Sequence, residues 1–326
     1  MNQIPGSLGT GNLSLVISAI YILTPRIRAY DLRALDEGEL PLVTAGSHLA
    51  IPVILDNGRA DVRQYSICSN PGQRDFYQIA VLRESTEHSG SIFIHDNFSV
   101  GMQLHCALPK NNFHLHADAS PAVFIAGGIG ITPIIAMAHT LAMRGRRFIL
   151  HYAGRSKSEM AFVEDLQRDF NRQVQLYPAD ENIRMDVMHV LADAPGNAHF
   201  YVCGPQRLLD ETISAASALG IAKDRIQHEH FHAEKYAGDK PVVLELARSN
   251  KIIQANADQS LLAALRDAGV HVNFDCCVGD CGTCAVKVLE GEPEHRDHVL
   301  SDAAKARGRM CVCVSRARGE KLVLDL

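Results

Sequence analysis

Four cysteines near the C-terminal end of this 326-residue chain have a spacing that suits an iron-sulfur cluster. Cys276, Cys281 and Cys284 follow the pattern Cys-x4-Cys-x2-Cys, and Cys313 lies further along the chain. Plant-type ferredoxins use this spacing to hold a 2Fe-2S cluster through four thiolates. The chain is therefore expected to carry electrons.

The residues between these cysteines favour iron-sulfur over zinc. Gly279 and Gly282 lie in the three-cysteine segment, where the backbone must turn tightly and direct its amides at the cluster sulfurs. Structural zinc sites usually pair their ligands in two short arms, whereas here three cysteines share one loop.

The residues alone leave the fourth ligand open, because Cys311 and Cys313 are two positions apart and share a face if they lie on a strand. Cys277, next to Cys276, is a further neighbour. Outside the four proposed ligands stands an odd number of cysteines, in a chain with no signal peptide and no long apolar span. A disulfide framework is therefore not expected. The cysteine content instead suggests that the protein works in a reducing cytoplasm. These five cysteines are Cys68, Cys106, Cys203, Cys277 and Cys311.

A glycine-rich turn in the middle of the chain is a candidate nucleotide site. The apolar run Ala122–Ala126 leads into Gly127, Gly128 and Gly130, and then into an expected helix over 133–144 with Thr132 as N-cap and Pro133 as its first residue. Backbone amides at a helix N-terminus bind pyrophosphate. Such a turn is also used for packing, but its place upstream of a redox cluster favours a ligand site. It is not the Rossmann Gly-x-Gly-x-x-Gly pattern.

A second turn, Cys203-Gly204-Pro205, follows another apolar run and precedes another expected helix. Ligands of open α/β sheets bind at the carboxyl ends of the strands. Cys203 is therefore expected to contact the nicotinamide, although an isolated cysteine is more often a small buried apolar residue.

A third motif, Arg63-Gln64-Tyr65-Ser66, ends an expected strand. Arg63 and Tyr65 share one face of that strand, and together they offer a phosphate ligand and a flat surface for a heteroaromatic ring. Ser89-Gly90-Ser91 precedes an expected short helix through Asp96 and offers a second anion site. Taken singly, each motif is better explained as ordinary packing.

Length and composition limit the number of domains and the classes of partner. A chain of 326 residues predicts two or three domains. The net charge of −5 argues against nucleic acid as a partner. No membrane association is expected either, because three glycines and Pro133 interrupt the apolar stretch 122–143.

The hydrophobic patterns predict three domains in order. The first, 1–117, is expected to be an antiparallel β-barrel with strands at 13–20, 49–55, 77–82 and 102–108. The second, 118–236, alternates strands at 122–126, 148–152 and 199–202 with helices at 133–144, 158–170 and 205–219, which predicts a parallel α/β sheet. The third, 237–326, has strands at 242–246 and 251–254, a helix at 260–268 and the cysteine loop, as in a β-grasp ferredoxin.

Together these motifs resemble the phthalate dioxygenase reductase family, NADH-dependent flavin and 2Fe-2S reductases that supply Rieske-type oxygenases. The resemblance spans essentially the whole chain, including His295-Arg296-Asp297 and the run from Cys313 to Ala317. The order of flavin, nicotinamide and ferredoxin domains is itself specific to this family.

The resemblance implies particular cofactor contacts. It makes Cys313 the fourth cluster ligand and FMN, not FAD, the flavin. The isoalloxazine and ribityl chain would contact Arg63, Tyr65 and Ser66, and the phosphate would lie near Arg83, Gly90 and Ser91. The dinucleotide would be oriented by Gly127, Gly128, Gly130 and Thr132, with Cys203, Gly204, Pro205 and Phe231 at the site of hydride transfer. Two departures from the family are the stretch Glu87-His88-Ser89 and the residue Cys277.

The implied function is the reductase component of a two-component Rieske-type oxygenase, passing electrons from NADH through FMN and the cluster to the oxygenase. A flavin is needed because NADH gives two electrons at once and the cluster takes one. The alternative is a stand-alone NAD(P)H-dependent reductase for another acceptor. Arg155-Ser156-Lys157 leaves NADPH open as the donor.

Basic residues crowd the chain around Cys313, although the whole protein is acidic. As a hypothesis, they form a docking rim for an acidic oxygenase surface. The residues are Lys305, Arg307, Arg309, Arg316 and Arg318.

Overall fold

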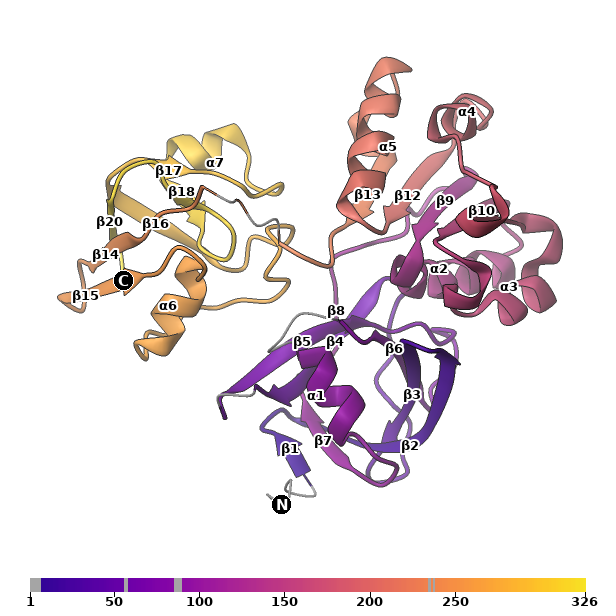
Figure 1. The fold of residues 1–326 in the computed structure, drawn as a ribbon, viewed down its shortest axis with the longest axis horizontal. Coiled ribbons are helices and arrows are strands. Elements are labelled where there is room, and N and C mark those ends of the chain that lie inside the picture. The colour runs from indigo at the N-terminus through magenta and orange to yellow at the C-terminus, as the bar shows by residue number, and fades with distance from the viewer. Residues whose placement is uncertain (1–6, 56–57, 85–89, 234–235, 237) are drawn as a thin grey trace. The chain divides into compact units, whose positions relative to one another are not determined.

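The computed structural model describes residues 7–55, 58–84, 90–233, 236 and 238–326. The chain forms two compact units, Met1–Glu229 and His230–Leu326. The sheets agree with the expected fold class: the first unit has a barrel-like pair of sheets and a parallel sheet, and the described residues of the second form a five-stranded mixed sheet with two helices (Figure 1).

The N-terminal part is built from two β-sheets around one apolar core. One sheet has the strand order β1-β7-β2-β3-β6 and the other the order β5-β4-β8. All pairings are antiparallel except β1 with β7. The elements are β1 (Ser7–Gly9), β2 (Leu13–Thr24), β3 (Ile27–Ala34), β4 (Ser47–Ile54), β5 (Ala60–Ser66), β6 (Tyr77–Leu82), α1 (Gly90–Asn97), β7 (Gln103–Cys106) and β8 (Lys110–Asn111).

Strand β2 runs four residues beyond the expected end at Ile20. The apolar alternation stops marking the strand there, because Tyr21 and Ile22 lie at the surface. The strand continues because its backbone stays paired with β3 as far as Thr24.

The second part of this unit is a five-stranded parallel sheet with the order β11-β10-β9-β12-β13. Its strands are β9 (Ala122–Gly127), β10 (Phe148–Gly154), β11 (Val174–Pro178), β12 (His199–Cys203) and β13 (Ile226–Glu229). From the central strand β9 the chain first adds strands on one side and then crosses to the other side at β12. The strand order therefore switches direction between β9 and β12, which is where open α/β sheets bind ligands.

Helices cover the sheet, and β9 is buried at every residue. One face packs against α4 (Val187–Ala192) and α5 (Gln206–Ala218). The remaining helices are α2 (Ile131–Met143) and α3 (Val163–Phe170), with short 3-10 turns at η1 (Gly128–Gly130), η2 (Lys157–Glu159), η3 (Asn171–Gln173), η4 (Ala179–Glu181) and η5 (Lys223–Arg225). The helix expected from residue 158 begins only at Val163, because Phe162 before it has left-handed backbone angles, φ 62°.

The second unit has the strand order β15-β14-β20-β16-β18 and a small separate pair, β17 with β19. Its strands are β14 (Val242–Leu246), β15 (Lys251–Ala255), β16 (Ala285–Glu290), β17 (Pro293–Glu294), β18 (Arg309–Cys311), β19 (Arg316–Ala317) and β20 (Lys321–Leu324), and its helices are α6 (Leu261–Asp267) and α7 (Asp302–Ala306). Ser260 caps α6, since its side chain accepts a hydrogen bond from the amide of Ala263 at 3.1 Å.

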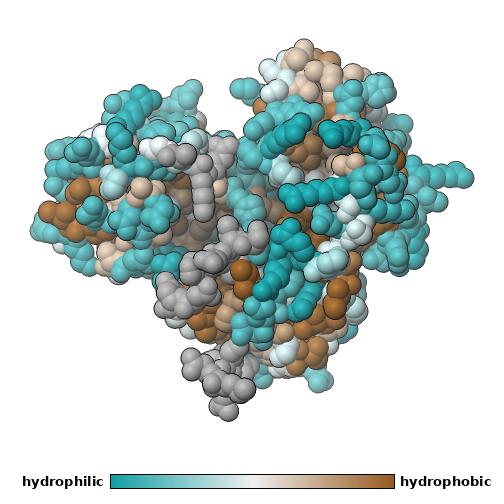
Figure 2. Space-filling model, in the orientation of Figure 1, coloured by the Kyte–Doolittle hydropathy of each residue, from teal (hydrophilic) through white to brown (hydrophobic). Residues whose placement is uncertain are grey.

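The molecular face drawn in Figure 2 is mainly hydrophilic, with apolar side chains in scattered groups. Among the described residues, no helix combines the length and the apolar character needed to cross a bilayer.

Candidate functional site

The two strand-to-helix turns of the parallel sheet lie against each other at the switch point. Cys203 pairs with Ala126 across strands β12 and β9, so the turn after each strand starts at the same edge. A Cβ atom on Gly127 would lie 2.7 Å from Pro205 Cδ, and one on Gly204 would lie 3.0 Å from Gly127 Cα. These glycines are therefore required for close packing of one turn on the other.

Gly128 differs from its neighbours. Its φ is +55°, and no atom lies within 4 Å of the position of a Cβ atom. The turn at Gly128 therefore has an open side on which a ligand can approach the backbone, followed directly by the N-terminus of α2. This fits the expected pyrophosphate site.

The expectation that Thr132 caps the helix is wrong. Helix α2 already begins at Ile131, with Gly130 as N-cap. Thr132 is 2% exposed, and its hydroxyl donates a hydrogen bond to the carbonyl of Ile129 at 3.0 Å. The 3-10 turn supplies the start of the helix, so Pro133 is its third residue instead of its first.

Cys203 is fully buried at the end of β12. The glycine turn next to it also reaches the barrel, because Ile129 packs against a small apolar cluster that includes Ala29 of β3 and Ala80 of β6. The glycine turn 127–130 and the N-terminal barrel are thus joined through apolar contacts within one compact unit.

The barrel brings the expected flavin residues together at β5 and the start of α1. Tyr65 packs against the barrel core and Ser66 is buried. A Cβ atom on Gly90 would lie 2.6 Å from Arg63 Cγ, so the N-terminus of α1 lies directly against Arg63. Two segments separated by more than twenty residues therefore form a cradle that only glycine permits, which fits a bound phosphate.

The expected phosphate residues also have contacts within the protein. Arg63 Nη1 donates to Asp61 Oδ2 at 2.8 Å. Arg83 forms a two-pronged ion pair with Asp96, at 2.6 and 3.3 Å, and this pairing raises the pKa of Arg83. The Ser91 hydroxyl accepts a hydrogen bond from the amide of Glu84 at 3.1 Å. The stretch Glu87-His88-Ser89 lies outside the described residues.

In the second unit the cysteines converge on one loop. The thiol of Cys276 contacts that of Cys281, and the thiol of Cys284 contacts those of both Cys311 and Cys313. Hydrogen bonds from these two neighbours lower the pKa of Cys284 to about 3, and the bond from Cys276 lowers the pKa of Cys281 to about 6. The same bonds raise the pKa values of their partners Cys276, Cys311 and Cys313, so these shifts report sulfur atoms that lie close together. Sulfur atoms gathered in this way suit an iron-sulfur cluster.

The cluster loop has an unusual backbone. Cys277, Gly279 and Gly282 have φ angles of 58°, 89° and 72°. At Gly279 a Cβ atom would lie 3.0 Å from Val314 Cγ2 and 3.2 Å from Asp297 Cα. Position 279 therefore requires glycine for two reasons: its φ angle is positive, and neighbouring atoms leave no room for a Cβ atom. The sequence predicted this tight turn between the cysteines.

The hypothesis of a basic rim is wrong for Arg316. This side chain is buried, and its guanidinium donates to the carbonyl oxygens of Gln259, Lys240 and Asn256. Arg307, Arg309 and Arg318 are exposed and Lys305 is half-buried. Arg316 therefore connects backbone segments in the interior by hydrogen bonds. The pattern of charges in the sequence cannot distinguish such a buried arginine from one at the surface.

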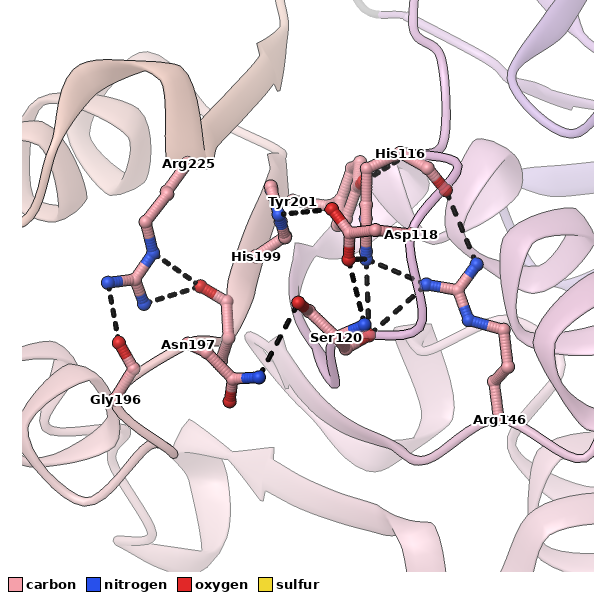
Figure 3. Close-up of polar contacts among 10 residues, drawn as sticks. His116, Asp118, Ser120, Arg146, Gly196, Asn197, His199, Tyr201 and Arg225 are labelled. Atoms are coloured by element: carbon pink, nitrogen blue, oxygen red, sulfur yellow. Dashed lines mark hydrogen bonds and ion pairs between the residues drawn. The ribbon is translucent and has the colours of Figure 1, made fainter.

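A polar network that was not expected from the sequence lies at the opposite, amino-terminal edge of the parallel sheet (Figure 3). The rings of His116 and His199 stack at 3.8 Å, and Asp118 lies 3.6 and 3.4 Å from them. The Tyr201 hydroxyl and Arg146 also contact the ring of His116. Both ring nitrogens of His116 are thus engaged by protein groups, so the network is suited to fastening the segment that joins barrel and sheet, not to holding a metal ion.

Phe231 belongs to the second unit and is partly buried there. All nine cysteines of the chain are free, so none of them forms a disulfide bond.

Two family models match the chain. The 2Fe-2S iron-sulfur cluster binding domain matches residues 244–318, and the N-terminal domain of dimethylamine monooxygenase subunit DmmA-like proteins matches residues 102–226.

Whole-length relatives agree with these models. The chain is 39% identical to the heme-dependent oxidative N-demethylase beta subunit of Ectopseudomonas mendocina, over 96% of this chain and 99% of that protein. It is 36% identical to the vanillate O-demethylase oxidoreductase of a Pseudomonas species, over 96% and 100%. The solved structure of phthalate dioxygenase reductase, which transfers electrons from pyridine nucleotides to [2Fe-2S], matches with a TM-score of 0.78 and 34% identity, over 96% and 98%.

These matches confirm the expected oxidoreductase activity, the role as the reductase subunit of an oxygenase or demethylase, and a cofactor set of a flavin, a 2Fe-2S cluster and NADH. The chain belongs to the phthalate dioxygenase reductase family.

Proposed function

We propose that this protein delivers electrons from NADH to a Rieske-type oxygenase and that the residues predicted from the sequence hold its cofactors. The observation that carries the proposal is the convergence of Cys276, Cys281, Cys284 and Cys313 on one loop with a backbone that requires glycine. A flavin supplies the conversion of an electron pair into single electrons, and a 2Fe-2S cluster supplies single-electron transfer.

The first unit's residues bind and orient. The amides of Gly128 to Gly130 and the N-terminus of α2 would hold the pyrophosphate of NADH, with Thr132 buried behind them. Cys203 and Gly204 would border the nicotinamide, because they end the strand next to β9 at the switch point. Phe231 is proposed as the aromatic side chain that covers the flavin where nicotinamide must stack.

Arg63, Tyr65, Ser66 and Gly90 would hold FMN. Tyr65 lies against the barrel core and offers an apolar ring with a polar tip, while Arg63 and the α1 amides offer positive groups. For Arg83 to contact the phosphate, it must exchange its partner Asp96, and the exposed position of this ion pair makes that exchange inexpensive.

Cys313 is proposed as the fourth ligand and Cys311 as its neighbour, although both thiols contact Cys284. The family run from Cys313 to Ala317 supports this choice. We also propose that the protein acts in the cytoplasm, since nine free cysteines suit a reducing compartment.

An anaerobic titration with NADH, followed by visible spectroscopy, tests the proposal. Flavin bands and a cluster shoulder are expected, both bleached by NADH, and chemical analysis should give two iron atoms per chain, as a 2Fe-2S cluster requires. A colourless protein that contains zinc would contradict the electron-transfer function.

A haem-dependent acceptor is the second candidate for the partner. It is favoured by the 39% identity to the beta subunit of a heme-dependent oxidative N-demethylase and by the match to the dimethylamine monooxygenase model. Purified Rieske and haem oxygenase components, supplied to the same reductase with NADH, would separate the two candidates by which component is reduced faster.

A further inference from the structure

His230, the first residue of the second unit, is attached to the cluster loop by its backbone and by its side chain. Its amide donates to Asp280 Oδ2 at 3.2 Å, and its ring Nδ1 lies 2.9 and 3.2 Å from the two carboxylate oxygens of the same residue. The His230 side chain is only 5% exposed and that of Asp280 15%. These contacts form a shielded pair.

Asp280 lies where its charge can affect the cluster. It lies between Gly279, whose φ is +89°, and the proposed ligand Cys281. The backbone of Asp280 also hydrogen-bonds to the thiol of Cys276, so this residue belongs to the wall of the cysteine site. A carboxylate on such a residue opposes the addition of a further negative charge when the cluster is reduced. The hydrogen bonds from His230 to this carboxylate partly neutralise its negative charge. They also fix the position of the carboxylate relative to the cluster.

His298 holds His230 from the other side. The two imidazole rings stack with centroids 4.6 Å apart and planes 9° apart. The amide of His298 in turn donates to the carbonyl of Gly279 at 3.2 Å. His230 is therefore enclosed by two segments that are themselves bonded to each other around the cluster loop.

A metal ion shared by His230, Asp280 and His298 explains this group less well. Their potential ligand atoms lie within 4.8 Å of one another. However, the His230 Nδ1 atom already bonds to Asp280, and the stacked rings direct their nitrogen lone pairs along nearly parallel planes instead of toward one point. This geometry orients a carboxylate and does not converge on a cation.

We propose that His230 is a positioning residue for the cluster: by holding the Asp280 carboxylate it sets the cluster's reduction potential. The segment that enters the ferredoxin unit is thereby part of the electrostatic environment of the cluster. This inference rests on the ligand assignment made under "Proposed function".

The test is an EPR-monitored reductive titration of the full-length protein with both cofactors bound. His230→Phe keeps a ring to stack on His298 but removes the side-chain donor, so the carboxylate becomes more negative and the potential should fall. Asp280→Asn removes the charge, so the potential should rise. His230→Asn places an amide donor near the former Nδ1 position and should restore a value close to that of the wild type. His271→Phe, an exposed histidine of the same unit, is the matched control and should leave the potential unchanged.

We expect each shift to be at least about threefold in the equilibrium constant for reduction, or about 28 mV for one electron. An unchanged potential in His230→Phe, or shifts of the same sign in His230→Phe and Asp280→Asn, would overturn the proposal. If His230→Phe fails to retain its cluster, a wild-type potential in Asp280→Asn would overturn it instead. Cluster content and NADH-driven flavin bleaching in the same samples test the proposed function separately. A wild-type protein that binds no cluster would refute the ligand assignment, whereas a bound cluster with an unchanged potential in His230→Phe would refute the role of His230 alone.

Discussion

Gly130 and Cys203 lie so close that Gly130 has no space for a side chain. A Cβ atom there would overlap the carbonyl group of Cys203 and lie 2.7 Å from the amide nitrogen of Gly204. The two turns at the switch point are therefore fixed relative to each other by backbone contact. The proposed pyrophosphate site and the proposed nicotinamide contact share one rigid support.

We predict that Gly130→Ala destabilises the fold, by about 1–3 kcal/mol, because the backbone atoms it meets cannot move aside as a flexible side chain would. Gly128→Ala meets no atom within 4 Å, so its cost is about 1–2 kcal/mol from the left-handed backbone angle alone. Chemical unfolding followed by fluorescence or circular dichroism measures both effects.

The open side of Gly128 makes this position a direct test of the proposed pyrophosphate site. Gly128→Ala is expected to raise KM for NADH at least fivefold, since its methyl group stands on the open side of the turn. Gly220→Ala carries the same strain, φ +70°, in open space after α5 and serves as the control with an unchanged KM. Equal KM values in the wild type, Gly128→Ala and Gly220→Ala would show that the pyrophosphate binds elsewhere.

Removal of a cluster ligand should separate the two halves of the electron path. In Cys281→Ala, NADH should still bleach the flavin at the wild-type rate, because the proposed nucleotide and flavin residues other than Phe231 lie in the first unit. Transfer to the oxygenase partner should fall by at least a hundredfold. Stopped-flow absorbance measures the first step and reduction of the partner measures the second.

Cys277→Ala is the matched control for that experiment. Cys277 is exposed and lies in the same loop, but it is not among the proposed ligands. The variant should keep its cluster and its partner activity. Loss of the cluster in Cys277→Ala, with retention in Cys281→Ala, would reverse the ligand assignment.

His151 should make the stability of the first unit depend on pH. Burial lowers the pKa of this histidine from 6.5 to about 4, and its Nδ1 atom lies 2.9 Å from the Tyr177 hydroxyl. The unfolded chain binds the proton more readily, so the stabilisation is complete above pH 6.5 and is lost as the pH falls toward 4. The free energy of unfolding should drop by about 3 kcal/mol over this range because of His151.

Urea unfolding at a series of pH values checks this prediction. His151→Gln cannot bind the proton and should flatten the pH dependence between 6.5 and 4. His114→Gln changes an exposed histidine of the same unit and should leave the wild-type slope intact. An equally steep slope in His151→Gln would assign the pH dependence to other groups.

Arg307 and Arg309 are exposed near Cys313 in sequence and remain candidates for partner docking. Arg309→Glu should slow reduction of an acidic partner about tenfold at low salt, and the difference should shrink as salt screens the charge. Lys251→Glu, an exposed charge on β15, is the control. A rate that does not respond to salt would exclude electrostatic docking through this surface.

The sequence by itself determined that an antiparallel β region, a parallel α/β region and a ferredoxin-like region follow one another, and it determined the chemistry of the cysteine loop. Short-range signals decide these features: the period-2 and helical patterns, the spacing of Cys276, Cys281 and Cys284, and the glycines that a turn needs within a few residues. The strand at Tyr77–Leu82 and the strand at Val242–Leu246 were predicted with their correct bounds, because each is a continuous β-rich run bounded by turn residues.

Only the tertiary structure decided which long-range contacts these signals serve. It shows that Gly127, Gly130 and Gly204 are needed for turn-on-turn packing while Gly128 faces open space, and that Arg316 is an interior tie and not part of a surface rim. It also brings His230 to Asp280, fifty positions along the chain. Residues that meet through folding leave no periodic trace in the sequence, because their partners are chosen by the path of the backbone and not by their neighbours.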